Sequence, residues 1–180
     1  QFEELERQAA FGFLEFIKDS GASQIIYLSG IKPIGATSQH LASRNSVEQY
    51  LAEGSIPVTT LRAGIVVGSG SASFEIIRDL VEKLPFMITP KWLNSKCQPI
   101  SIRNVLHYLT SLLGQPKAFN NTYDIGGPEV LTYKKMLLEF AEVRGLKRYI
   151  VTLPVLTPRL SSYWLYFVTS TSFFLAKNLV

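Results

Sequence analysis

Strand-like and helix-like segments alternate through the first half of this chain. In the order strand, helix, strand, helix, they lie at residues 24–28, 38–54, 58–67 and 73–84. Parallel strands need a long crossover connection, usually a helix, so this order predicts a parallel sheet in an α/β fold. Ser38 and Ser73 are the residues expected to cap the two helices at their N-termini.

The rest of the chain shows a looser mixture of elements. Residues 2–19 carry apolar side chains at helical spacing, among them Leu5, Phe13 and Phe16, and Gly21 follows as a C-cap. Later helices are expected from Ser101 to Leu113 and from a Thr132 cap to about Arg144, with short strands at 86–89, 122–125 and 149–153. This second part is therefore predicted to be a small α+β lobe.

Composition narrows the class of protein. The 180 residues are 47% hydrophobic and 18% charged, which suits a globular domain with a substantial core. The net charge of +4 is spread along the chain, so we predict no nucleic-acid binding. Cys97 is the single cysteine and only His40 and His107 accompany it, which excludes an internal disulfide and a zinc-finger spacing. A reducing, cytoplasmic location is expected.

The two ends of the sequence bear on membranes and partners. Residues 1–4 lack the features of a signal peptide. Residues 160–180 are rich in apolar side chains, but Thr169 to Ser172 interrupt the run, so a membrane span is not expected. We expect this segment to form a core helix or a hydrophobic interface, covered by a protein partner or by a domain outside this sequence.

Five segments together resemble a known family. They are residues 26–30, 61–68, 98–100, 123–129 and 156–160. The set is similar to the atypical, extended branch of the short-chain dehydrogenase/reductases, often labelled nucleoside-diphosphate-sugar epimerase-like. The resemblance covers nearly the whole chain in the family's order. It implies a Rossmann-like fold that binds NAD or NADP.

The resemblance also implies that the chain is only the C-terminal part of such a protein. The first helix resembles the one before the family's fifth strand, so the N-terminal glycine-rich half that holds the pyrophosphate is absent. Residues 1–70 are then the C-terminal half of the dinucleotide-binding fold. Residues 71–180 are mainly a substrate lobe, with some elements that return to the sheet.

Three residues match the family's catalytic positions. Ser29 stands where a Ser or Thr polarises a substrate carbonyl, while His40 and Arg44 replace the family's Tyr and Lys. Residues four apart share a helical face, so this pair can reach one ligand. His40 would exchange a proton near neutral pH, and Arg44 would bind ribose hydroxyls. The alternatives are that His40 and Arg44 are surface residues without chemistry, and that Ser29 is a turn residue.

Further residues are expected to bind ligands without doing chemistry. The resemblance implies cofactor contacts by Leu28, Ser29, Arg44, Arg62, Ala63, Gly64 and Ile65. Ser71 and Ser73 lie at a predicted helix N-terminus, where hydroxyls and amides suit a substrate phosphate; N-capping is the alternative. No metal ligands are predicted.

The implied function is that of an NAD(P)-binding oxidoreductase or epimerase acting on a small or nucleotide-linked substrate. Because His40 and Arg44 replace Tyr and Lys, a non-catalytic NAD(P)-sensing regulator or assembly factor that binds a protein partner stays open. A hydrophobic-ligand or membrane-surface protein using residues 160–180 is a third alternative.

Overall fold

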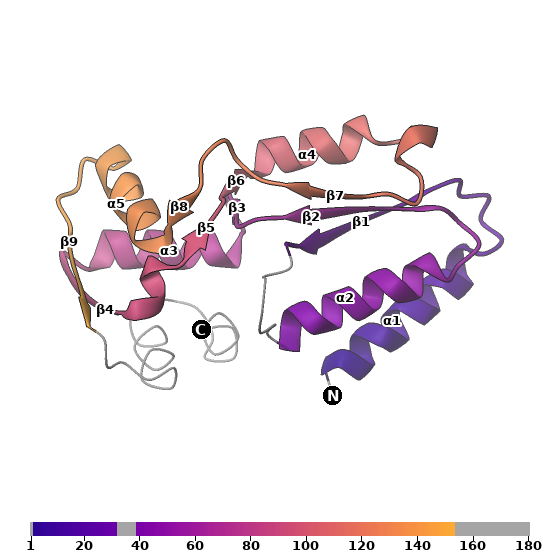
Figure 1. The fold of residues 1–180 in the computed structure, drawn as a ribbon, viewed down its shortest axis with the longest axis horizontal. Coiled ribbons are helices and arrows are strands. Elements are labelled where there is room, and N and C mark those ends of the chain that lie inside the picture. The colour runs from indigo at the N-terminus through magenta and orange to yellow at the C-terminus, as the bar shows by residue number, and fades with distance from the viewer. Residues whose placement is uncertain (1, 32–38, 154–180) are drawn as a thin grey trace. The chain divides into compact units, whose positions relative to one another are not determined.

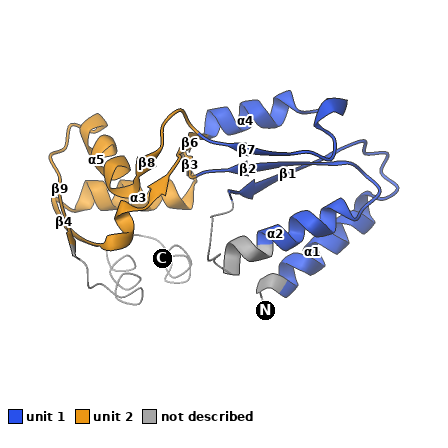
Figure 2. Cartoon of the chain, viewed as in Figure 1, with its two compact units in different colours: residues 1–64, 102–126 blue, residues 65–101, 127–180 orange. Residues whose placement is uncertain are grey.

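The computed structural model describes residues 2–31 and 39–153, which form two compact units (Figures 1 and 2). Unit 1 comprises residues 1–64 and 102–126, and unit 2 comprises residues 65–101 and 127–180. The chain therefore enters unit 2 after Gly64, returns to unit 1 at Ile102 and leaves it again after Gly126.

Unit 1 is built on a parallel three-stranded sheet. Its strands are β1 (Ile25–Gly30), β2 (Val58–Ala63) and β7 (Thr122–Ile125), in the order β1-β2-β7. The helix α2 (Gln39–Ala52) connects β1 to β2, with Ile25 in register with Val58. This arrangement confirms the α/β class and the parallel sheet. The alternation predicted it, because a helical crossover is the usual way to join neighbouring parallel strands.

Helices lie on both sides of this sheet. The helix α1 (Phe2–Ile17) packs beside α2 below the strands in Figure 1, while α4 (Ile102–Ser111) runs above β7. The short 3-10 helix η2 (Pro116–Ala118) then leads to β7. Ile17, Ile25, Leu51 and Val58 form the buried core between the helix pair and the sheet.

The predicted apolar face of the first helix is wrong in part. Among the described side chains of α1, Ala10 and Ile17 are buried, whereas Leu5, Phe13 and Phe16 are exposed, Phe16 to 83%. Apolar residues surround this helix, so their spacing does not single out one stripe; packing against α2 decides which is buried. In α4 the amphipathic pattern is present, but only Val105 is buried.

The described part of unit 2 combines short strand pairs with helices. Parallel pairs are β3 (Val66–Val67) with β6 (Ile100–Ser101) and β4 (Phe86–Pro90) with β9 (Tyr149–Leu153). An antiparallel pair joins β5 (Lys96–Cys97) to β8 (Leu131–Thr132). The helices are α3 (Ala72–Lys83), the 3-10 helix η1 (Lys91–Asn94) and α5 (Tyr133–Val143).

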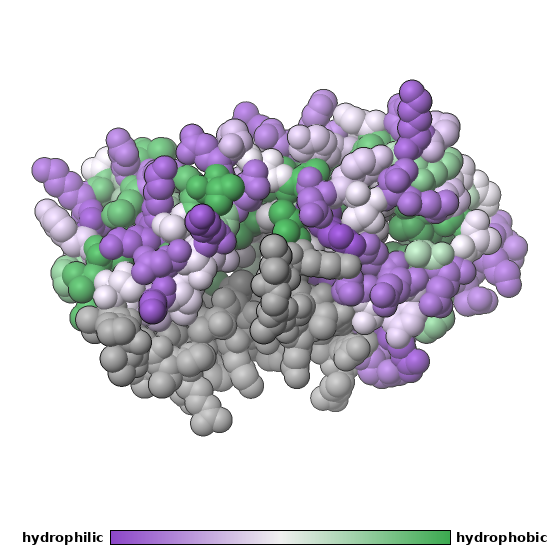
Figure 3. Space-filling model, viewed as in Figure 1, coloured by the Kyte–Doolittle hydropathy of each residue, from purple (hydrophilic) through white to green (hydrophobic). Residues whose placement is uncertain are grey.

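The core of unit 2 lies between α3 and α5. Val81, Met87 and Leu137 are among its most buried side chains. The β4–β9 pair carries exposed side chains on one face, namely Phe86, Ile88, Tyr149 and Val151. Hydrophobic residues at the surface show as green areas in Figure 3.

Capping hydrogen bonds and glycine residues decide where several of the predicted helices and strands begin or end. Thr132 caps α5 as expected, because its hydroxyl accepts a hydrogen bond of 3.0 Å from the Lys135 amide. Gly145, at φ +67°, ends the same helix. The single strand predicted at residues 58–67 is instead two strands, β2 and β3. They separate at Gly64, whose amide donates to the Ile125 carbonyl in β7.

Candidate functional site

Ser29 lies near the carboxyl end of β1. It is 5% exposed and stands in register with Arg62 of β2. Because β1 and β2 are parallel and α2 follows β1, the carboxyl ends of both strands and the start of α2 meet at one edge of the sheet. Ligands of open α/β sheets bind outside this edge.

The first turns of α2 carry His40 and Arg44. The helix begins at Gln39, so both residues are helical and their four-residue spacing places them on one face. The side chain of Arg44 is half-buried. The side chain of His40 lies outside the described residues, and its role stays a prediction.

Tyr27 is a member of this site that the sequence interpretation missed. It shares a face of β1 with Ser29, because side chains two apart on a strand point the same way. Its phenol donates a hydrogen bond of 3.4 Å to the backbone carbonyl of Arg44. The two-residue spacing of Tyr27 and Ser29 was the feature of the sequence from which Tyr27 could have been predicted as a site residue.

The environment of Tyr27 acts on its ionisation in two directions. Burial raises the pKa of Tyr27, and this effect prevails. The positive charge of Arg44 and a hydrogen bond with the Ser29 hydroxyl act to lower the same pKa. The phenol is thus held neutral at physiological pH, close to both predicted site residues.

The side chain of Arg62 is committed to an ion pair. Its Nη2 lies 2.6 Å from Oε1 of Glu48 in α2, and its Nε donates to Oε2 at 3.2 Å. The Thr122 hydroxyl in β7 donates to the same Oε1 at 3.2 Å. Only the backbone of Arg62 is therefore left for the predicted cofactor contact, and Glu48 emerges as the residue that fixes α2 on the sheet.

Some backbone groups after Arg62 are also engaged in hydrogen bonds within the protein. The Ala63 carbonyl accepts a hydrogen bond of 3.0 Å from the Ile31 amide. The Gly64 amide donates to Ile125, as described above. Leu28, a further predicted cofactor contact, is exposed on the face of β1 opposite Tyr27 and Ser29.

The two predicted substrate serines occupy different positions at the start of α3. Ser71, not Ser73, is the N-cap residue, and its hydroxyl donates to the Val66 carbonyl at 2.7 Å instead of capping the helix. Ser73 lies inside the first turn. The prediction that Ser73 is the N-cap is therefore wrong. The hydrogen bond from Ser71 to the Val66 carbonyl holds Ser71 just before the first helical residue.

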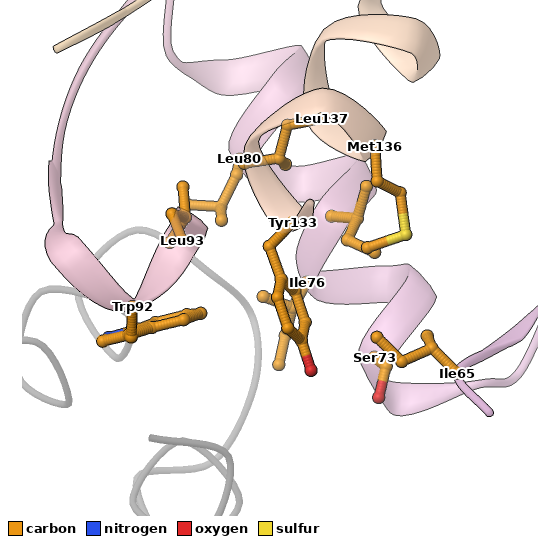
Figure 4. A pocket seen from close by; sticks show the side chains of 10 residues that line it. Ile65, Ser73, Ile76, Leu80, Trp92, Leu93, Tyr133, Met136 and Leu137 are labelled. Atoms are coloured by element: carbon orange, nitrogen blue, oxygen red, sulfur yellow. The ribbon is translucent and has the colours of Figure 1, made fainter. Parts of the chain in front are cut away.

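Ser73 also lines a cavity of about 160 Å³ within unit 2, which we call the α3–α5 cavity (Figure 4). Its inner wall is aliphatic and comes mainly from Ile76, Ile77, Leu80, Met136 and Leu137. Ile65, a predicted cofactor contact, lies beside Ser73 at its edge.

Tyr133 and Trp92 complete the lining of the α3–α5 cavity. Their rings meet edge to face, with centroids 5.6 Å apart and an interplanar angle of 85°. Burial raises the pKa of Tyr133, and the nearby Cys97 acts in the same direction. The phenol therefore stays protonated and able to donate a hydrogen bond.

Two kinds of feature do not occur among the residues that the structure describes. No group of three or more His, Cys, Asp or Glu side chains is arranged to hold a metal ion. No helix in this part of the chain is long and apolar enough to cross a membrane. Residues 160–180, predicted to be an interface, lie outside the described residues.

Comparisons with known proteins identify the fold. No protein-family model matches the sequence, and no curated protein matches it. Among solved structures, an epimerase from Methanothermobacter thermautotrophicus is similar, with a TM-score of 0.68 and 13% identity over 83% of this chain and 52% of that one. A UDP-glucuronic acid 4-epimerase from Bacillus cereus, in complex with UDP-glucuronic acid and NAD, has a TM-score of 0.64 and 16% identity.

A third similar structure is that of RMD from Pseudomonas aeruginosa, complexed with NADPH, with a TM-score of 0.65 and 14% identity. This chain matches over 97% of its length to the Bacillus protein and over 94% to the Pseudomonas protein, and covers 64% and 68% of them. It thus spans from about half to two thirds of these three proteins. The shared fold is the Rossmann-like α/β fold that the sequence predicted.

Proposed function

We propose that this chain is the C-terminal part of an NAD(P)-binding protein of the short-chain dehydrogenase/reductase type. It would act as an oxidoreductase or epimerase on a small or nucleotide-linked substrate. The observation that supports this most is the β1–α2–β2 unit, with Ser29 at its carboxyl edge and Arg44 on the following helix. Similar solved structures with NAD or NADPH bound support the same proposal.

The residues at this edge fit a dinucleotide. Gly30, Ala63 and Gly64 are small, so a flat ring can approach the backbone closely at the strand ends. Arg44 would bind the ribose hydroxyls with its permanent charge. The cofactor supplies a hydride donor or acceptor when bound.

The proposed chemistry needs one proton donor or acceptor beside the substrate. Ser29 would donate its hydroxyl hydrogen to a substrate oxygen and polarise it. His40 would give or take the proton at that oxygen, since an imidazole titrates near neutral pH. Before substrate binds, Ser29 would donate its hydroxyl hydrogen to Tyr27, and the substrate oxygen would then replace Tyr27 as the acceptor; the raised pKa of Tyr27 keeps it from acting as a base.

Part of the cofactor site is proposed to come from chain outside this sequence. Among the described strands, β1 pairs only with β2, so its other edge is open to a further strand. The similar structures extend over one and a half to about two times the matched length, in keeping with such an addition. The glycine-rich turn that holds the pyrophosphate would belong there.

Cofactor binding and turnover test this proposal separately. Calorimetry with NADH and NADPH should show binding to the full-length natural protein and none to residues 1–180 alone. His40→Ala in the full-length protein should abolish turnover of a substrate panel and leave cofactor binding unchanged. His107→Ala is the matched control, because His107 is the only other histidine and lies exposed on α4. Failure of the full-length protein to bind either nucleotide would overturn the proposal.

A second candidate is a non-catalytic NAD(P)-sensing regulator. The half-buried phenol of Tyr27 favours it, because it donates its hydrogen to the Arg44 carbonyl and its raised pKa keeps it from acting as a base. This candidate predicts tight cofactor binding without turnover of any substrate, in the natural protein as well as in His40→Ala.

A further inference from the structure

The α3–α5 cavity has the size of a ligand site. Its volume of about 160 Å³ is that of a single ring. An engineered cavity of about 150 Å³ in another protein, lined by Leu, Ile and Phe, stays dry and binds benzene. The described residues leave the cavity partly open, so a small compound can enter it.

The residues that line the cavity disfavour a charged ligand. None of the described side chains that line it is an Asp, Glu, Lys or Arg. Ile76, Ile77, Leu80, Leu93 and Leu137 are each at most 7% exposed, so the interior is hydrocarbon. Burying a phosphate or a carboxylate there without a partner would be strongly unfavourable. The chemistry favours a neutral, apolar group.

Two hydroxyls provide the polar contacts. In Figure 4 the hydroxyls of Tyr133 and Ser73 point toward the same side of the cavity. They come from different helices, α5 and α3. The Trp92 ring packs against Tyr133 and limits its rotation, which fixes the direction of the phenol. An oxygen atom on a bound ring can accept a hydrogen bond from either group.

We propose that the α3–α5 cavity binds a small neutral ring compound, with its hydrocarbon part against Ile76, Leu80 and Leu137 and a hydroxyl or carbonyl oxygen bonded to Tyr133 and Ser73. All of these residues belong to unit 2. The site therefore does not depend on NAD(P) binding, and its failure would leave the cofactor proposal untouched.

Methionine resonances allow a direct test in the full chain. The protein has two methionines: Met136 lines the cavity, whereas Met87 is buried in the same core outside the lining. With both methyl groups labelled with carbon-13, phenol and benzene should shift the Met136 resonance in a saturable way. Met87 should move much less. A dissociation constant on the order of 1 mM is reasonable for a ligand of this size.

Variants separate the hydroxyl contact from the cavity itself. Tyr133→Phe should weaken phenol binding by about three- to tenfold, as the loss of one hydrogen bond implies, and leave benzene binding unchanged. Tyr149→Phe is the matched control, since Tyr149 is exposed in the same unit and does not line the cavity. Ile76→Phe should fill the space and prevent binding of both compounds.

The outcomes are distinct. Saturable shifts confined to Met136 and lost in Ile76→Phe support the site. No shift in the unmodified protein, or equal and unsaturable shifts of Met136 and Met87, overturns it. The unmodified protein alone decides this point, so a variant that fails to fold does not weaken the test. Equal phenol affinity in Tyr133→Phe and in the unmodified protein would overturn the assigned role of the phenol.

Discussion

The guanidinium of Arg62 and the carboxylate of Glu48 form a two-point ion pair that joins β2 to α2. Nη2 lies 2.6 Å from Oε1, and the Arg62 and Glu48 side chains are only 19% and 14% exposed. Thr122 adds a bond from β7, so one carboxylate connects the helix that carries Arg44 to two strands. The position of the candidate site relative to the sheet therefore depends on this pair.

Glu48→Ala should lower the free energy of unfolding by about 2–3 kcal/mol, because it leaves the Arg62 charge largely buried without a partner. Urea titration followed by circular dichroism measures the change. Glu4→Ala is the control: Glu4 pairs with Arg7 on the exposed surface of α1, so its loss should change the free energy of unfolding far less than the loss of Glu48. Equal losses in the two variants would contradict the importance assigned to the buried pair.

Gly127→Ala should be strongly destabilising, by about 3 kcal/mol or more, since the cost of overpacking rises steeply with backbone clashes. A Cβ at Gly127 would clash with the Pro99 carbonyl oxygen, which also accepts a hydrogen bond of 3.0 Å from the Gly127 amide. Thermal unfolding of the two proteins tests this.

Gly12→Ala provides the matched comparison, because nothing lies within 4 Å of a Cβ at Gly12 in the exposed face of α1. Alanine is the better helix former, so this variant should gain about 0.5–1 kcal/mol. A Gly127→Ala protein as stable as Gly12→Ala would show that the tight approach of residue 127 to Pro99 is absent in solution.

Cys97 should react slowly with thiol reagents. Burial raises the pKa of its thiol, which lowers the fraction of reactive thiolate at pH 8. The rate of modification by an aromatic disulfide reagent should be several-fold below that of glutathione and reach it in concentrated urea. Reaction as fast as glutathione in the folded protein would contradict the burial of this thiol.

Stability should fall as the pH rises above about 10, in part because of Tyr27 and Tyr133. Burial raises the pKa of both phenols, so between the unfolded and folded pKa values the folded state holds more protons. Their contribution is complete below the unfolded pKa and is lost as the pH rises through the folded pKa.

Tyr27→Phe and Tyr133→Phe should each flatten this decline, measured as the free energy of unfolding against pH. Tyr149→Phe should leave it unchanged, since Tyr149 is exposed. A decline of the same slope in all three variants would exclude the two buried phenols as its source.

Much of the local structure could be read from residue spacing. The helices at 39–52 and 133–143 begin and end close to the expected residues, and Thr132 caps the second as predicted. N-caps and C-terminal glycines of helices depend on interactions within a few residues, so they can be predicted from the sequence. Ser73 was predicted as the N-cap in place of Ser71, because the hydrogen bond from Ser71 to Val66 depends on the path of the preceding strand and cannot be read from local spacing.

Residue spacing was enough to predict the alternation of parallel strands and helices, with Ser29 and Arg44 at the carboxyl edge, because periodicity and crossover length are properties of the chain. Which groups meet at that edge depends on how the elements pack. Glu48 takes the Arg62 side chain, and Tyr27 joins Ser29 and Arg44. The α3–α5 cavity likewise arises where two helices distant in sequence pack imperfectly, and no local pattern encodes a void between them.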